Sequence, residues 1–154
     1  MNRKVGWLLT GVLVGIVAVG PWQARSEAGT GKATIRINDR VLASTRIDMG
    51  PRGVSPGDQE IIRSRLLERG TGNTIGRSEL LCTFVDSGRS RSCRGTYILP
   101  KGKLVVGGSL LYQQFYELAV LGGTGLYDNA RGTLTVTRTG RKPVRDAVVF
   151  RLVG

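Results

Sequence analysis

The sequence predicts an all-β domain that closes into an antiparallel barrel, and three observations support this. Glycine accounts for 23 of the 154 residues, which is about twice its usual share of about 7%. Short segments with alternating apolar and polar side chains recur at intervals of roughly 8–12 residues, and glycine-rich turns separate them. Closure of such a sheet would also remove exposed strand edges, which promote aggregation.

The N-terminus has the pattern of a secretory signal peptide. A basic stretch at residues 2–4 precedes an uncharged run at residues 5–19, which is short for a membrane span of about 20 residues. Residues 26–28 have the small-x-small spacing of a cleavage site. We therefore assign residues 1–28 to a signal segment and residues 29–154 to the barrel domain of a secreted or cell-envelope protein. An uncleaved membrane anchor is the alternative.

Alternation predicts the first strands of the barrel. Residues 33–38 alternate apolar and polar side chains, and residues 41–49 extend the same sheet. A loop rich in glycine and proline follows at residues 50–58. In residues 61–67 two arginines occupy alternate positions, which favours a strand over a helix, and residues 70–73 make the next turn.

The central segment predicts a β-hairpin. Residues 80–85 and 90–99 read as strands, and residues 86–89 form a four-residue loop between them. This register places Cys82 opposite Cys93, at a pair where side chains approach closely. In an oxidising compartment the two thiols are expected to form a disulfide. Two buried thiols beside a ligand are the alternative.

The remaining strands follow at regular intervals. Residues 104–106 form a strand that two glycines, Gly107 and Gly108, interrupt with a bend or bulge. Residues 110–121 are apolar and aromatic and predict a strand with an irregular entry. A tight turn at residues 122–125 then leads to the last two strands, which we expect at residues 132–138 and 146–153.

The predicted interior is apolar. One face of the central hairpin carries Leu80, Cys82, Phe84, Cys93, Gly95, Tyr97 and Leu99, and alternation turns Val148, Phe150 and Leu152 inward on the final strand. A small barrel either fills its interior with side chains or holds one small ligand. Because Gly95 and Gly108 lie on the inward face, they leave space, and we expect a ligand cavity.

The composition excludes several classes of enzyme. The chain contains no histidine and only two cysteines, which excludes Ser-His-Asp and Cys-His nucleophiles, an imidazole base and a four-cysteine zinc site. Carboxylates are then the candidate acids and bases. We select Asp58, which directly precedes a strand, and Glu117 as candidate catalytic residues. A turn-capping role is the alternative for Asp58.

The charge of the chain is strongly positive. There are 23 Lys and Arg side chains against 11 Asp and Glu, a net charge of +12. The basic residues are spread over strands and hairpin tips, without the interleaved aromatics of an RNA-binding signature, so we expect no nucleic-acid partner. A solvated surface explains this charge, and weak contact with an anionic cell envelope is the functional alternative.

One motif resembles a known group of barrels. The stretch at residues 122–132 reads Gly-Gly-Thr-Gly, a short spacer, then Ala-Arg-Gly, which is similar to the pattern of dirigent proteins. Residues 95–97 (Gly-Thr-Tyr) and the Leu81–Cys82 pair also match motifs of the allene oxide cyclase-like superfamily, which includes dirigent proteins and bacterial cyclases. Ile61 and Ser64 replace the Pro and Asn of plant allene oxide cyclases, so allene oxide chemistry itself is not expected.

The resemblance implies a closed eight-stranded antiparallel barrel, usually a homo-oligomer (dimer or trimer), that works without a metal or organic cofactor. Its apolar lumen would fold a flexible small molecule into one reactive shape. The residues expected to contact this substrate are Cys82, Phe84, Tyr97, Tyr112, Phe115 and Phe150.

Three functions therefore compete. The first is an exported cyclase or isomerase that acts on an apolar small molecule by confinement. The second is a non-catalytic, lipocalin-like binder of such a molecule. The third is a structural module held to the cell envelope by its positive charge.

Overall fold

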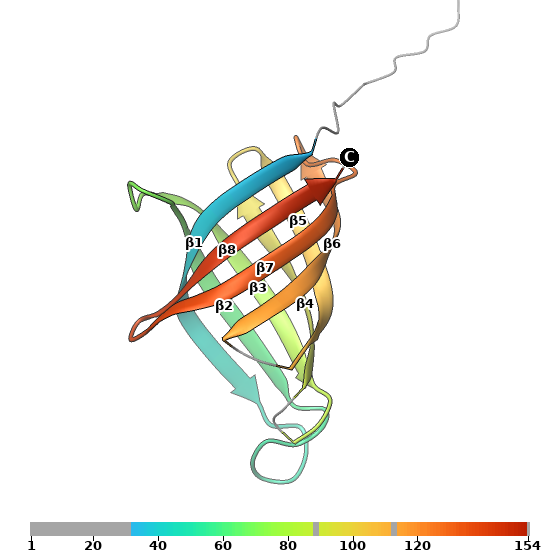
Figure 1. Cartoon of the computed structure of the whole chain (residues 1–154). Helices are drawn as coiled ribbons and strands as arrows, with labels where there is room; N and C mark the ends of the chain where they lie inside the picture. The colour runs from blue at the N-terminus through green and yellow to red at the C-terminus, as the bar shows by residue number, and fades with distance from the viewer. Residues whose placement is uncertain (1–31, 88–89, 112–113, 154) are drawn as a thin grey trace, which may run out of the picture.

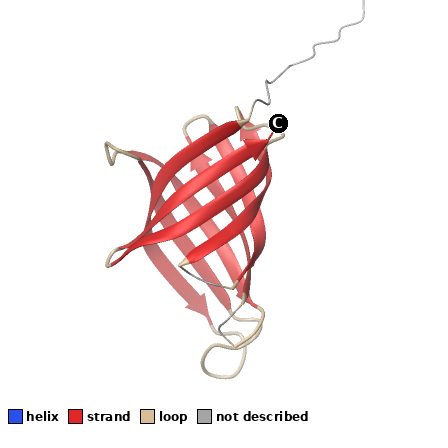
Figure 2. Ribbon diagram, viewed as in Figure 1, coloured by secondary structure: helices blue, strands red, loops and turns tan. Residues whose placement is uncertain are grey.

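The computed structural model describes residues 32–87, 90–111 and 114–153. They form a closed barrel of eight antiparallel strands, in which each strand pairs with its neighbours in sequence and the last strand pairs with the first (Figure 1). Figure 2 shows a barrel built from strands and loops alone. The predicted fold class and the number of strands are thus confirmed.

The strands are long and evenly distributed along the chain. They are β1 (Ala33–Ile47), β2 (Gln59–Glu68), β3 (Thr74–Phe84), β4 (Arg91–Leu99), β5 (Gly102–Leu110), β6 (Phe115–Gly125), β7 (Arg131–Arg141) and β8 (Val144–Val153). In the part of the chain that the structure describes, no helix is long and apolar enough to cross a membrane. The predicted signal segment, residues 1–28, lies outside the described residues.

Alternation along the strands builds the core as expected. Burial follows every second residue on β3 and β4, so that Leu80, Cys82 and Tyr97 point inward while Leu81 and Arg94 point outward. The predicted register of the central hairpin is confirmed, because Cys82 pairs with Cys93. Period-2 patterning therefore identified the inward face of this hairpin correctly.

Two local predictions were wrong. Residues 122–125 are the end of strand β6 and not a tight turn, since the turn falls at residues 126–129. These glycines pair with β5, and close backbone approach explains Gly123: a Cβ there would lie 2.1 Å from the Tyr127 carbonyl oxygen and 2.8 Å from the Lys103 carbonyl oxygen on β5. Strand β5 also runs without interruption through Gly107, although its register against β6 shifts between Val105 and Val106.

The Ala-Arg-Gly end of the glycine motif has a structural role. Gly132 has a φ of 143°, and a Cβ there would lie 1.9 Å from the carbonyl oxygen of Arg151 on the neighbouring strand. The Arg131 guanidinium donates a hydrogen bond to the Leu121 carbonyl oxygen at 2.9 Å, and Ala130 is buried. The motif therefore fastens β6 to β7.

The interior divides into two regions along the barrel axis. One end of the barrel is the end at which β1 begins and β8 finishes (Figure 1). We call it the packed half, and it is filled by buried side chains near the corresponding ends of their strands, including Leu66, Leu104, Leu134 and Phe150. The other end, called the open half, carries the loop at residues 48–58 and the turn at residues 142–143 (Figure 1). The open half contains a cavity.

Candidate functional site

The cavity in the open half has a volume of about 220 Å³ and is partly open to solvent. Its lining includes charged side chains, whereas the sequence predicted an apolar interior with Tyr97 and the cysteines as its polar or reactive members. The lining residues are Asp39, Val41, Ser44, Glu60, Ile62, Ser64, Leu80, Cys82, Arg91, Cys93, Tyr97, Leu110, Tyr116, Arg138, Val144 and Asp146. All eight strands contribute at least one residue to this lining.

The predicted cavity exists, but the inward glycines do not create it. A Cβ on Gly95 would lie 2.6 Å from the Leu80 side chain, and a Cβ on Gly108 would lie 3.3 Å from the Leu118 side chain. These leucines therefore occupy the space beside the glycines. The cavity instead lies where short or charged side chains replace large apolar ones on the inward face.

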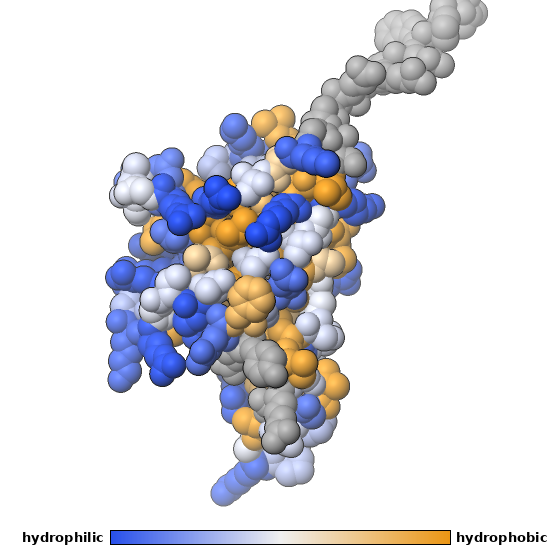
Figure 3. Space-filling view, viewed as in Figure 1, coloured by the Kyte–Doolittle hydropathy of each residue, from blue (hydrophilic) through white to orange (hydrophobic). Residues whose placement is uncertain are grey.

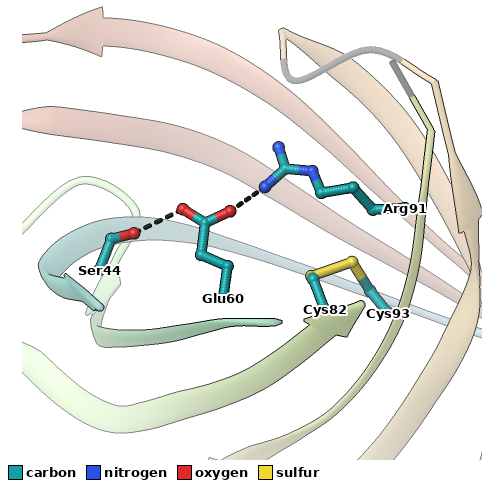
Figure 4. A network of polar contacts seen from close by, with 5 residues as sticks. All are labelled: Ser44, Glu60, Cys82, Arg91 and Cys93. Carbon is teal, nitrogen blue, oxygen red and sulfur yellow. Dashed lines mark hydrogen bonds and ion pairs between the residues drawn. A yellow bond between two sulfur atoms is a disulfide. The ribbon is translucent and has the colours of Figure 1, made fainter. Parts of the chain in front are cut away.

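A buried ion pair forms one wall of the cavity. Glu60 on β2 accepts a hydrogen bond from the Arg91 guanidinium on β4 and a second one, of 2.5 Å, from the Ser44 hydroxyl on β1 (Figure 4). The side chains of Arg91 and Glu60 are only 8% and 17% exposed. Arg91 also lies 5.2 Å above the Phe84 ring, as does Arg46. Phe84 thus supports the charged wall from behind.

The disulfide lies next to this ion pair. Cys82 and Cys93 are bonded across β3 and β4, and both sulfur-bearing side chains line the cavity (Figure 4). The disulfide that the sequence predicted is therefore present in the structure, and the alternative of two free thiols is not. The bond links two strands that are already neighbours, so it stiffens the cavity wall locally.

A cluster of three ionisable side chains, from β1, β7 and β8, lies in the opposite wall of the cavity. Asp39 on β1 pairs in register with Asp146 on β8, which pairs in register with Arg138 on β7. The Arg138 Nε lies 2.5 Å from Asp146 Oδ1 and forms an ion pair with it. Asp39 does not share this arginine and accepts a hydrogen bond of 3.2 Å from the Ser78 hydroxyl at Oδ2.

Asp39 is an incompletely hydrogen-bonded, buried carboxyl group. Asp39 is only 5% exposed to solvent, and its Oδ1 atom accepts no hydrogen bond from any described residue. Burial raises the pKa of Asp39 to about 6, and the hydroxyls of Ser64 and Ser78 oppose this shift. Asp146 raises the pKa further and Arg138 lowers it. Asp39 therefore gains and loses its proton near neutral pH.

Two tyrosines complete the site. Tyr97 and Tyr116 both line the cavity, and burial raises the pKa of each phenol, so both stay protonated at neutral pH. The ring of Phe150 packs edge-on against Tyr97, with ring centroids 5.1 Å apart. Phe150 itself is fully buried below the cavity floor. A phenol that stays neutral can donate a hydrogen bond to a bound molecule.

The first candidate acid of the sequence analysis, Asp58, lies in the loop before β2. Its carboxylate accepts hydrogen bonds of 2.9 Å from the backbone amides of Met49 and Ser55, and one from the Ser55 hydroxyl. These hydrogen bonds lower its pKa. This is the loop-capping geometry that was the alternative for Asp58, and the residue does not line the cavity.

Only some of the other predicted catalytic and substrate-contacting residues lie at the cavity. Glu117 is exposed on the outside of β6, where it accepts a hydrogen bond of 3.1 Å from Thr135, and Phe115 is 54% exposed on the same strand. Tyr112 lies outside the described residues. Of the predicted contact residues, the cavity is lined by Tyr97 and Cys82, with Phe84 and Phe150 in the layer behind.

Sequence reasoning missed the charged lining, although part of the signal was present. Inward Ile35 and Ile37 predict an inward residue 39 if the first strand continues, and inward Val148 and Phe150 predict an inward Asp146. The prediction ended the first strand at residue 38 and did not follow this alternation. The pairing of Asp39 with Asp146 depends on the closure of β1 on β8, for which no local signal exists.

The described residues offer no evident metal site. In residues 32–87, 90–111 and 114–153, no group of three or more histidine, cysteine or acidic side chains is arranged to hold a metal ion. The groups that could contact a bound molecule are instead two ion pairs, one separate carboxyl group, two phenols and serine hydroxyls.

Comparisons with known proteins agree with this architecture. No family model and no curated protein matches the sequence. Among solved structures, a pyocyanin demethylase is similar with a TM-score of 0.69 and 22% identity, over 79% of this chain and 100% of that chain. A pterocarpan synthase dirigent protein is similar with a TM-score of 0.61 and 12% identity, over 79% and 93% of the two chains.

A Diels–Alderase from Streptomyces koyangensis has a TM-score of 0.63 and 19% identity, over 78% of this chain. The match spans 64% of the Diels–Alderase chain, so this chain corresponds to only part of that enzyme. At such identities the similarity establishes the fold. The fold that the resemblance implied is confirmed at this level: the chain forms a closed eight-stranded antiparallel barrel, and its fold is similar to that of the dirigent protein and the Diels–Alderase.

Proposed function

We propose that this protein binds a small molecule in the open half of the barrel and cyclises or isomerises it while the cavity holds it in one conformation. The cavity volume of about 220 Å³ is below the range of about 300–1,000 Å³ for drug-sized ligands. The substrate is therefore small, with an apolar body and at least one polar group to match the charged walls. The names of the similar dirigent protein and Diels–Alderase support a cyclisation chemistry.

The observation that carries this proposal is the Asp39 carboxyl group in the cavity wall. An acid or base is most effective when its pKa lies near the pH at which it works. The pKa of about 6 for Asp39 meets this condition, whereas a solvent-exposed aspartate has a pKa of about 3.9. Asp39 accepts a proton from the bound molecule and returns it to another atom of that molecule.

The other groups have positioning roles in this mechanism. Confinement of reacting atoms in a favourable geometry can supply about 7–11 kcal/mol of a barrier. The ion pairs Arg91–Glu60 and Arg138–Asp146 hold their own side chains in place on opposite walls. Tyr97 and Tyr116 donate hydrogen bonds to oxygen or nitrogen atoms of the substrate. The proton moves only between Asp39 and the substrate, so no further reactant is needed.

A substrate screen with matched variants tests the proposal. The full chain is purified without denaturation, examined by native mass spectrometry for a bound compound, and incubated with polyene and phenolic candidates. Chromatography with mass detection then follows isomeric products. We expect turnover by the wild type, a loss of about 100-fold or more in Asp39→Asn, and no loss in Glu79→Gln, which changes the same charge on the exposed outer face.

Two outcomes contradict the proposed catalysis. Equal turnover by Asp39→Asn and the wild type would remove Asp39 from the chemistry. A compound that copurifies, occupies the cavity and is released unchanged under all conditions would favour the second function, a non-catalytic binder. Both results are readable because Asp39→Asn is expected to remain folded.

The outer surface supports a further proposal, that the barrel contacts an anionic envelope surface. Arg40 pairs in register with Arg65 on one side and with Arg145 on the other, and Arg65 pairs with Arg77. All four side chains are exposed, and the visible face of the molecule is rich in hydrophilic side chains (Figure 3). Binding to vesicles with anionic lipid should weaken steeply with salt; salt-independent binding would contradict it.

Export and oligomerisation are also proposals. The disulfide is consistent with an oxidising, extracytoplasmic compartment, and cell fractionation with N-terminal sequencing of the mature protein tests export. Outward Ile61 and Leu81 face each other in register and remain 37% and 44% exposed, which supports a homo-oligomer. Light scattering of the purified protein tests this, and a monomer at all concentrations would contradict it.

A further inference from the structure

The charges that line the cavity do not balance. Within the described residues the lining contains three carboxyl groups, on Asp39, Glu60 and Asp146, and two guanidinium groups, on Arg91 and Arg138. Each arginine has a partner, because Arg91 pairs with Glu60 and Arg138 pairs with Asp146. Asp39 is left without an ion-pair partner among the described residues.

The surroundings of Asp39 do not supply a substitute for that partner. The groups that face it are Ser64 on β2, Ser78 on β3, Tyr97 on β4, Tyr116 on β6, Arg138 on β7 and Asp146 on β8. Only Arg138 is cationic, and its Nε is engaged by Asp146. At pH 7.5 Asp39 is largely ionised, since its pKa is about 6. A buried carboxylate with one oxygen that accepts no hydrogen bond is energetically unfavourable until a donor or a cation reaches it.

Two aromatic side chains line the same cavity. Tyr97 and Tyr116 line the cavity near Asp39, and burial raises the pKa of both phenols, so neither adds a negative charge. The faces of aromatic rings attract cations, most strongly where water is excluded. A carboxylate without an ion-pair partner and two neutral phenols in the lining of one cavity favour a cation over an anionic group.

We infer that the ligand of this cavity is a small cationic nitrogen compound, either a protonated amine or a positively charged aromatic heterocycle, whose charge pairs with Asp39. The inference rests on the proposed function, because it names the substrate class of the same cavity. The cation neutralises the one unpaired carboxylate, and its apolar body contacts Ile62, Leu80 and Leu110 in the remaining lining. Binding in this way also stabilises the ionised form of Asp39, which is the form that accepts a proton in the proposed function.

Three probes of nearly equal shape test this inference. N-methylquinolinium is a permanent cation, 1-methylnaphthalene is its neutral counterpart, and 1-naphthoate is an anion of similar size. Titrations of the full chain, followed by calorimetry or fluorescence, are made at pH 7.5 and pH 5.0. At pH 7.5 we expect the cation to bind about tenfold or more tightly than the neutral probe, with the anion weakest.

The pH dependence and two variants separate this site from a merely apolar pocket. Lowering the pH to 5.0 protonates most of Asp39, so the affinity for the cation should fall about tenfold while that for 1-methylnaphthalene stays constant. Asp39→Asn should remove the preference at both pH values. Glu79→Gln, which changes the same charge on the exposed outer face, should retain it.

Each possible result decides a different question. If the cation and the neutral probe bind equally well, or if the preference survives in Asp39→Asn, the inference is overturned while the proposed cavity function stands. If the neutral probe alone binds, the inference is likewise overturned. If none of the three probes binds, the proposed binding function fails together with the inference.

Discussion

The packed half and the open half are built from the same eight strands, yet they have opposite chemistry. In the packed half the inward positions carry residues such as Leu104, Leu134 and Phe150, each 0% exposed. In the open half the inward positions of β1, β2 and β8 carry Asp39, Glu60 and Asp146. The close packing of the packed half therefore offsets the cost of a cavity and of a carboxyl group without an ion-pair partner in the open half.

The same truncation in the two halves should have unequal costs, and this is the largest effect that we predict. Leu104→Ala in the packed half should lower the free energy of unfolding by about 4–5 kcal/mol, because close neighbours leave a new void. Leu110→Ala beside the cavity should cost only about 2 kcal/mol, since this side chain already borders open space. Urea unfolding of both variants measures the difference. Equal costs would mean that the two halves are equally well packed.

Breaking the ion pair of the open half should have the next largest effect. Arg91→Met leaves Glu60 without its partner in a largely buried place and should cost about 2–4 kcal/mol. The double variant Glu60→Met/Arg91→Met should recover at least half of this loss, because no uncompensated charge remains. Urea unfolding of the two single variants and the double variant forms the required cycle. A double variant as unstable as Arg91→Met would contradict the explanation.

Asp39→Asn should stabilise the protein at a pH above the pKa of Asp39 and have much less effect at a lower pH. The pKa of Asp39 is higher in the folded protein, about 6, than the ordinary value of 3.8, so the folded state binds this proton more tightly. The contribution of Asp39 to stability therefore falls as the pH rises from about 4 to about 6 and is then constant. We expect a gain of about 2–3 kcal/mol for the variant at pH 8 and of less than about 1 kcal/mol at pH 4.

Urea unfolding of wild type and Asp39→Asn at the two pH values tests this prediction. A gain of the same size at pH 4 and pH 8 would show that ionisation of Asp39 is not its cause. Together with loss of function in the same variant, a pH-dependent gain would identify Asp39 as a residue that is kept at a cost in stability.

Substitutions on the outer face of the barrel should have similar effects over the packed half and the open half, and for these we predict the smallest change in stability. Arg65 lies between Arg40 and Arg77 in register, and like charges at directly opposed positions are destabilising. Arg65→Gln should raise the free energy of unfolding by roughly 0.2–1 kcal/mol at low salt and by nearly nothing at about 1 M NaCl.

Lys103→Gln is the matched control for this prediction. Its neighbours in register are Ile98 and Thr124, which carry no charge. Thermal or urea unfolding should therefore show no salt-dependent gain for this variant. A gain of the same size in both variants would assign the effect to the total charge and not to the row of arginines.

Much of the fold was predictable because its signals are local. The register of the central hairpin followed from the length of its loop, and it paired Cys82 with Cys93 correctly. The glycines at residues 122–125 were assigned to a turn although they lie in β6, because glycine marks both turns and places where two backbones approach closely. A single sequence does not separate these two uses of glycine.

The candidate site was less predictable than the fold. Tyr97 and the cysteines were placed correctly on the inward face, but Asp58 lies in a loop and Glu117 on the outside of the barrel. Both were selected because composition made carboxylates the main candidates. The acids that line the cavity are Asp39, Glu60 and Asp146, and their shared property is inward position, which only the registers reveal.

The sequence by itself determined an all-β chain, its alternating inward faces and the pairing of its two cysteines, because strand periodicity and loop length act over a few residues. Only the tertiary structure decided where the cavity lies and which charges meet in it. Asp39 and Asp146 come from opposite ends of the chain and face each other because β1 closes on β8 in one register. A shift of one residue in that pairing would turn both side chains to solvent, so the site exists only in the closed barrel.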